Sequence, residues 1–193
     1  MSVRHALLAL LEQGPRYGYQ LRADFEARTG TTWPLNVGQV YTTLSRLERD
    51  GLVDAEGDDG EGHQVYRITP SGRAEVADWF SRPVARTQPP RDELAIKLAI
   101  AVTIPGIDVG TVIQQQRSAT ISALQDYTRL KRDVDGADRP DLAWSLVLDS
   151  LVFGAEAEVR WLDHCEARIR RHARAARPDE TSPAESTTPK ALR

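Results

Sequence analysis

The sequence predicts a mostly helical protein with one small β-hairpin, and three observations support this fold class. Apolar residues recur at helical spacing through the N-terminal region. Two short segments of alternating character then flank a Gly- and Asp-rich stretch at 56–62. Finally, a narrow apolar stripe continues over about 30 residues towards the C-terminal end. The 40% hydrophobic and 27% charged content is that of an ordinary globular protein, so a packed core is expected.

The first two helices are marked by apolar spacing and by residues that end helices. Residues 2–13 carry apolar side chains three and four positions apart, namely Val3, Ala6, Leu7, Leu10 and Leu11. The pair Gly14-Pro15 ends this helix, because proline cannot continue it and glycine suits a left-handed exit. A second helix is expected from about Tyr19 to Thr29, where Gly30 stops it.

A third helix is expected over 37–50, with Asn36 as a favourable N-cap. At 100° per residue, one side of this helix is apolar and consists of Val37, Val40, Tyr41, Leu44 and Leu47. The opposite side carries polar side chains, namely Gln39, Thr42, Arg46 and Arg49. An apolar side for the core and a polar side for base edges suit a helix that enters the major groove of DNA.

A β-hairpin and a fourth helix complete the N-terminal region. Residues 52–55 and 65–69 predict two short strands around the Gly-rich turn. A helix with Pro70 at its first position follows and runs through Trp79 and Phe80. Three helices, a hairpin and a fourth helix form the order of a winged helix-turn-helix domain, which we place at residues 1–82.

The C-terminal region is expected to be all-helical. A Pro- and Arg-rich linker at 83–91 is followed by a short helix, a helix over 109–134 and a last helix over about 141–172. The last helix carries the long stripe, which consists of Trp144, Leu148, Leu151, Ala155, Val159, Leu162, Cys165 and Ile169. Such a length suggests packing against a helix of a second copy. We therefore expect a dimerisation domain at 92–173 and a disordered tail at 174–193.

Composition and motifs limit the classes of function. No apolar run approaches the roughly 20 residues that cross a bilayer, and the apolar stretch after Met1 lacks a signal-peptide cleavage site. The single Cys165 fits a reducing compartment, so we expect a cytoplasmic protein without membrane contact. The net charge of −3 and the pI near 5.8 argue mildly against nucleic-acid binding, although a local basic stripe can be hidden in such averages.

Motifs for catalysis, cofactors and metals are missing from the sequence. There is no phosphate-binding loop with its terminal Lys-Ser/Thr pair, no H-E-x-x-H and no G-x-S-x-G. His164 and His172 on the last helix are eight residues apart and do not converge on one point as zinc ligands must. We expect a protein that is not an enzyme and that has no cofactor and no metal site.

Several motifs resemble the PadR family of regulators. Residues 14–21 spell GPRYGYQL, and further matching positions are Gly38, Tyr41, Leu44, Leu47, Glu48, Gly51, Leu52, Val53, Tyr66, Ile68, Thr69 and Gly72. The match covers residues 5–80, and the C-terminal half agrees in length and helical character. The resemblance implies a DNA-binding winged helix and a helical dimerisation region. The wing departs from the family pattern, because residues 56–64 are acidic and Arg67 is the remaining cation of the hairpin.

The hypothesis for DNA recognition rests on the third helix. Gln39 can pair with an adenine edge and Arg46 with a guanine edge, while Thr42 and Thr43 can contact a thymine methyl or a phosphate. Tyrosine hydroxyls and further cations would contact phosphates, which fixes the register on the duplex. The expected DNA-binding residues are Tyr17, Gly38, Gln39, Tyr41, Thr42, Thr43, Arg46, Arg49 and Arg67, with Arg4 and Arg16 as added charge. A homodimer on double-stranded DNA would then bind a roughly palindromic operator, as a repressor.

Two questions stay open at this point. A winged-helix domain with an acidic wing is also compatible with a protein-interaction module that does not bind DNA directly. The second question concerns five aromatic residues, Trp79, Phe80, Trp144, Phe153 and Trp161. The resemblance implies a small aromatic effector that relieves repression, and these residues are its candidate site. The alternative is that they are ordinary core residues, since aromatic side chains contribute most to cores in general.

Overall fold

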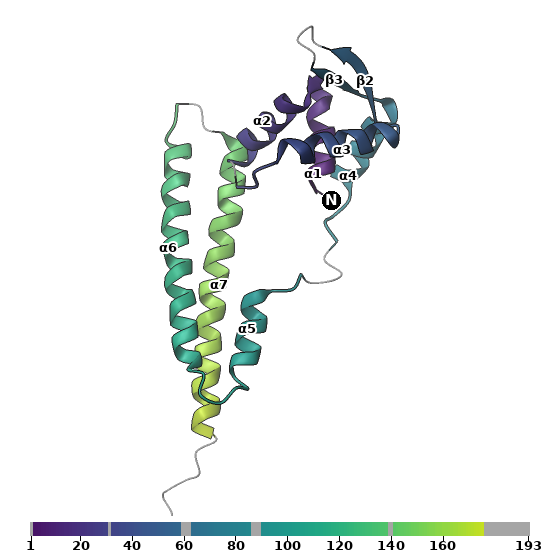
Figure 1. Ribbon diagram of the computed structural model, residues 1–193. Coiled ribbons are helices and arrows are strands. Elements are labelled where there is room, and N and C mark those ends of the chain that lie inside the picture. Colours follow the sequence, from purple (N-terminus) through teal and green to yellow (C-terminus); the bar gives the residue numbers. More distant parts are fainter. Residues whose placement is uncertain (1, 31, 59–62, 86–89, 139–140, 176–193) are drawn as a thin grey trace, which may run out of the picture.

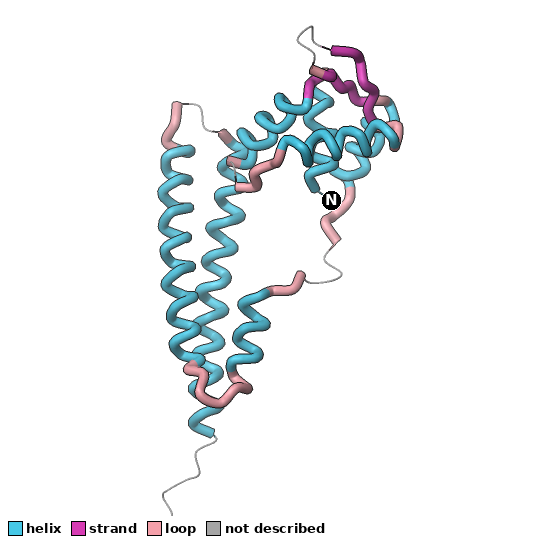
Figure 2. The backbone as a smooth tube through the Cα atoms, in the orientation of Figure 1, coloured by secondary structure: helices cyan, strands magenta, loops and turns pink. Residues whose placement is uncertain are grey.

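Two groups of helices, joined by the segment after α4, make up the structure (Figures 1 and 2). The computed structural model describes residues 2–30, 32–58, 63–85, 90–138 and 141–175. Its elements are α1 (Ser2–Leu10), a 3₁₀ turn (Leu11–Gln13), β1 (Arg16–Tyr17), α2 (Gly18–Thr29), α3 (Val37–Arg49), β2 (Val53–Asp58), β3 (Gln64–Ile68), α4 (Pro70–Ser81), α5 (Glu93–Ala101), α6 (Val109–Asp135) and α7 (Leu142–Ala175).

The predicted order of three helices, hairpin and fourth helix is confirmed, and a third strand is added to the hairpin. The sheet has the order β1-β3-β2, and both pairs are antiparallel. Tyr17 lies opposite Val65, and Val53 lies opposite Ile68. Strand β1 was not predicted, because two residues are too few to show an alternating pattern. Its effect is to fasten the start of α2 to the sheet beside α3.

The core of the N-terminal group surrounds α3. Its fully buried side chains come from α1, the 3₁₀ turn, α2, α3 and β2, and they are Leu7, Leu8, Leu11, Leu21, Val40, Leu44, Leu47 and Val53. On the apolar side expected for α3, Val40, Leu44 and Leu47 are buried, Tyr41 is half-buried and Val37 is exposed. Val37 is 38% exposed, because the first turn of a helix has fewer neighbouring elements to cover it. The polar side of α3 is thereby fixed towards solvent.

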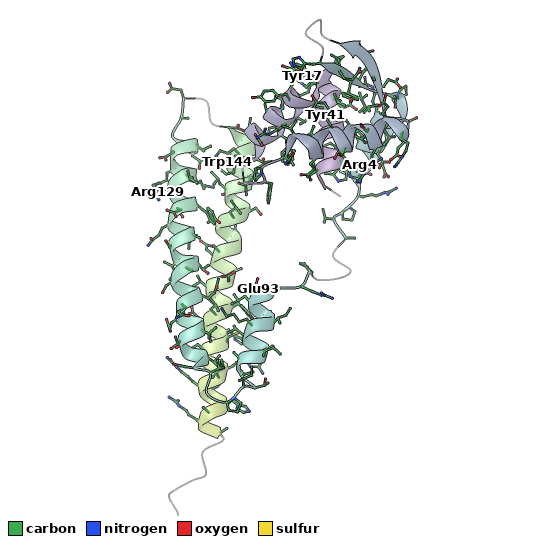
Figure 3. All side chains as sticks on the ribbon, viewed as in Figure 1. Arg4, Tyr17, Tyr41, Glu93, Arg129 and Trp144 are labelled. Carbon is green, nitrogen blue, oxygen red and sulfur yellow. The ribbon has the colours of Figure 1, made fainter. Side chains whose placement is uncertain are left out.

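Two glycines stand where other parts of the chain come too close for a side chain. The first turn of α4 approaches Leu52, the residue before β2, and a Cβ atom on Gly72 would lie 2.2 Å from its carbonyl oxygen. Gly30 ends α2 in the left-handed region at φ 56°, and a Cβ atom there would lie 2.4 Å from the Trp144 ring of α7. Figure 3 shows Trp144 next to the end of α2, so this contact joins the two groups of helices.

Helices α6 and α7 form an antiparallel pair that is bridged by polar side chains (Figure 1). Arg117 of α6 lies 2.8 Å from a carboxylate oxygen of Asp163 and 2.7 Å from one of Glu166. Lys131, at the other end of α6, pairs with Asp149. The Arg117 guanidinium holds the pKa of Glu166 below its usual range, because it donates a hydrogen bond to the ionised carboxylate.

A second hydrophobic core lies where α5 meets this pair. Leu98, Ile113 and Leu162 are buried, and Leu94, Trp161 and Ile169 are among the side chains that pack around them. Helix α7 continues to Ala175, which is two residues beyond the expected end of the helical region at 173. In the ranges given above, no helix is both long and apolar enough to cross a membrane.

Candidate nucleic-acid interface

Helix α3 is held in place by its cap and by a close contact with α2. The Asn36 side-chain oxygen accepts a hydrogen bond of 2.8 Å from the Gly38 backbone N–H, as expected for an N-cap. The half-buried Tyr41 ring lies against Gly18, where a Cβ atom would come within 2.8 Å of the ring. Gly18 of the YGY motif therefore gives the third helix room to approach the second. Gly38 itself is exposed at the start of α3.

The exposed side of α3 presents the residues expected there. Gln39, Thr42, Arg46 and Arg49 are exposed, and at 100° per residue they fall within an arc of about 80°. The buried Val40, Leu44 and Leu47 lie on the opposite side of the helix. An amide, a hydroxyl and guanidinium groups are thus collected on one convex surface, which fits the width of a DNA major groove.

The positive charges near this surface differ in whether they already have partners. Arg49 lies 3.2 Å from Asp50, and Arg4 donates a hydrogen bond of 3.0 Å to the same carboxylate. Arg16 pairs with Asp24 at 3.2 Å. The Arg46 side chain has no ion pair and no hydrogen bond within the part of the chain that the structure describes. Of the expected cations on α3, Arg46 is therefore the one whose charge is fully available.

The two threonines of α3 use their hydroxyl hydrogens within the helix. Thr42 Oγ1 donates a 2.8 Å hydrogen bond to the Gly38 carbonyl, and Thr43 Oγ1 donates one of 2.7 Å to the Gln39 carbonyl. Their methyl groups and oxygen lone pairs remain for other contacts. Because its hydroxyl hydrogen is donated within the helix, Thr42 is suited to contact a thymine methyl or to accept a hydrogen bond from a base. It is less suited to a phosphate contact, because a phosphate oxygen needs a donated hydrogen.

The described part of the wing carries little free positive charge. Arg67 of β3 forms an ion pair with Glu56 of β2 across the hairpin. The hydrogen bond from Arg67 lowers the pKa of the Glu56 carboxyl, so this carboxylate stays ionised beside the strand. Much of the acidic stretch expected at the wing tip, residues 59–62, lies outside the described residues. The charge that Arg67 offers to a phosphate is thus partly neutralised.

Two tyrosines lie at the start of α2 with different surroundings. The Tyr17 ring stacks on His63 of the wing, with ring centroids 5.0 Å apart (Figure 3 labels Tyr17). Tyr19 is 60% exposed and belongs to the first turn of α2. Tyr19 was absent from the expected contact residues, although the YGY motif contains it. Its exposure, which the sequence does not give, makes it a further candidate for a phosphate contact.

The five aromatic residues considered as an effector site do not lie together. Trp79 and Phe80 form a tilted pair with centroids 4.7 Å apart, and they line a groove of about 410 Å³ with Phe25, Val76 and Leu10. Trp144 lies against Gly30, Trp161 packs on the second core, and Phe153 is 64% exposed. Since Trp144, Phe153 and Trp161 are eight or nine residues apart, about 12 Å or more of helix separates each from the next.

Two protein-family models match the chain, one in each half. Residues 7–78 match the transcriptional regulator PadR-like family, and residues 90–170 match the virulence activator alpha C-terminal family. "Probable transcriptional regulator Rv1176c" of Mycobacterium tuberculosis is 29% identical over 179 residues, which are 84% of this chain and 95% of the relative. The negative transcriptional regulator PadR of Bacillus subtilis is 26% identical over 177 residues, which are 86% and 97% of the two chains.

Solved structures show the same fold. Bacillus subtilis PadR in complex with operator DNA has a TM-score of 0.68 at 23% identity, covering 88% of this chain and 99% of that one. The same protein in complex with p-coumaric acid has a TM-score of 0.69 at the same identity and coverage. The resemblance expected from the sequence motifs is confirmed. The chain belongs to the PadR-like family of transcriptional regulators, and its C-terminal region is of the virulence activator alpha type.

Proposed function

We propose that this regulator is a homodimer that binds a specific DNA operator and represses transcription by occupying a promoter. The observation that carries the proposal is the exposed side of α3, where Gln39, Thr42 and Arg46 face solvent while the apolar side is buried. The relative from Bacillus subtilis is a negative regulator that has been crystallised with operator DNA, which supports both the DNA target and the sign of regulation.

In this proposal the side chains of α3 divide into base contacts and phosphate contacts. Arg46 donates to a guanine edge, Gln39 pairs with an adenine edge, and the Thr42 methyl contacts a thymine methyl. Gly38 allows the backbone at the start of α3 to come close to the DNA. The remaining expected residues contact phosphates or position the helix, and they are Tyr17, Tyr41, Thr43, Arg49 and Arg67.

The homodimer is proposed from the apolar side chains that α7 leaves exposed. Leu142, Leu146 and Phe153 are 70%, 60% and 64% exposed. At 100° per residue, these three positions fall within an arc of about 40° on one face of α7. Large apolar side chains aligned on one helix face are typical of a surface that a partner covers. A second α7 would bury them.

Replacing Phe153 by Asp is expected to convert the dimer into a monomer. A buried, unpaired carboxylate at the centre of such an interface costs several kcal/mol, which is enough to shift a dimer to monomers at micromolar concentration. Sedimentation velocity measures the change. Val84→Asp introduces the same carboxylate at an 84% exposed site after α4 and should leave the dimer intact. A dimeric Phe153→Asp protein would contradict the proposed interface.

Selection of bound sequences from a random DNA library tests the operator. Two winged-helix domains related by a twofold axis should select a palindrome whose half-sites are about one helical turn, roughly 34 Å, apart. Enrichment of such a site at physiological salt supports the proposal. No enrichment, together with binding to a basic protein partner, would favour the protein-interaction module with its acidic wing.

We further propose that a small aromatic effector relieves repression and binds the groove between α1, α2 and α4. Trp79, Phe80 and Phe25 line this groove, which is almost entirely apolar apart from its rim. The binding of p-coumaric acid by the relative from Bacillus subtilis supports an aromatic ligand class.

Titration with p-coumaric acid is expected to quench tryptophan fluorescence through Trp79. The quenching should disappear in the Trp79→Phe variant, because the remaining tryptophans lie outside the groove. Equal quenching of the variant and the unaltered protein would place the ligand elsewhere.

A further inference from the structure

A second cavity lies at the opposite end of the molecule from the winged domain. It has a volume of about 430 Å³ and is lined by residues of the α5–α6 turn, the start of α6 and the end of α7, namely Val102, Val109, Arg168, Ile169, His172 and Ala173. Figure 1 shows that turn beside the C-terminal end of α7. The volume lies within the range of small-molecule sites. The cavity adjoins the second core, since Val109 and Ile169 pack against it.

The wall of this cavity combines an apolar body with two basic side chains. Val102, Val109 and Ile169 provide the apolar part, and Arg168 and His172 come from the same face of α7, four residues apart. Neither basic side chain has an ion pair or a hydrogen bond among the described residues, whereas the neighbouring Arg170 pairs with Glu166. Among the described residues, no Asp or Glu lines the cavity. The cavity therefore offers unpaired donors next to an apolar surface.

We propose that this cavity binds a small organic carboxylate with an apolar body. The Arg168 guanidinium is suited to a bidentate contact with a carboxylate, and the His172 imidazole can add a third donor. The apolar part of the ligand would lie on Val102, Val109 and Ile169. A helix of a second copy is a poorer occupant, because an apolar helix would bury both basic side chains without partners. The site is separate from the DNA-binding surface and from the groove at Trp79.

The test uses three probes that separate the head group from the apolar body. Isothermal titration of the protein with octanoate, octanol and acetate should show octanoate binding roughly 10-fold or more tightly than either other probe. The double variant Arg168→Gln with His172→Gln should lose this preference for octanoate over octanol. Ala173→Trp, which fills the cavity without removing a donor, should lose octanoate binding altogether.

A matched control separates the site from the general charge of α7. Arg171→Gln removes an exposed cation of the same helix that does not line the cavity, and it should bind octanoate as the unaltered protein does. The proposal would be overturned if octanoate bound no more tightly than octanol. It would also be overturned if Arg171→Gln lost as much octanoate affinity as the double variant. Ala173→Trp that dissociates the dimer would instead identify the cavity as a subunit interface. Operator binding by the double variant should be unchanged, so failure here leaves the proposed DNA-binding function standing.

Discussion

Replacing Arg46 by Ala is expected to weaken operator binding by about 1–3 kcal/mol, which is roughly 5- to 150-fold in Kd. The reason is that Arg46 is exposed on α3 and free of ion pairs in the described part of the chain. Its guanidinium can therefore donate to a guanine edge without first breaking an internal contact. The loss should be larger for the operator than for unrelated DNA, so the ratio of the two affinities should fall. Titrations of both DNAs by fluorescence anisotropy at one salt concentration give this ratio.

Arg73→Ala is the matched control for Arg46→Ala. Arg73 is a 52% exposed arginine of α4 that pairs with Glu12 of the 3₁₀ turn, and it lies outside the proposed DNA surface. Its replacement removes the same charge from the same domain, so it should change operator affinity much less. Equal loss in both variants would mean that Arg46 acts only through net charge. If Arg46→Ala bound the operator with unchanged affinity, α3 would not be the recognition helix.

Replacing Gly72 by Ala is expected to destabilise the winged domain by about 3 kcal/mol, the upper part of the range for overpacked sites. The new Cβ atom would lie 2.2 Å from the Leu52 carbonyl oxygen and 2.7 Å from the Ile68 side chain. The Leu52 oxygen cannot move freely, because it accepts a 3.0 Å hydrogen bond from the Thr69 backbone N–H. The start of α4 would have to shift away from Leu52. Urea unfolding followed by circular dichroism measures the change.

Gly154→Ala provides the comparison for Gly72→Ala. Gly154 lies in the middle of α7, and a Cβ atom there would have no neighbour within 4 Å. Alanine favours a helix interior over glycine by about 1 kcal/mol, so this variant should be equal to or more stable than the unaltered protein. If Gly72→Ala were as stable as Gly154→Ala, the close approach of α4 to Leu52 would be contradicted.

The sequence by itself determined the order and type of the elements, apart from the two-residue strand β1. Asn36 was expected to cap the third helix, and its side chain does accept the Gly38 N–H. Val40, Leu44 and Leu47 were expected on a buried face, and all three are fully buried. These features depend on residues within a few positions of one another, so capping and apolar periodicity report them directly. The family resemblance arose from the same local motifs.

Only the tertiary structure decided which side chains are free to act. Arg4 and Asp50 are 46 positions apart, and Arg73 and Glu12 are 61 apart, so no local pattern predicts that these charges are paired. The same holds for the separation of Trp79 from Trp161, for the exposure of Tyr19 and for the cavity at Arg168. Local signals determine helices and strands, because each forms from neighbours in the chain. Ion pairs and cavities form between elements that are distant in sequence, and their partners are set when the elements pack.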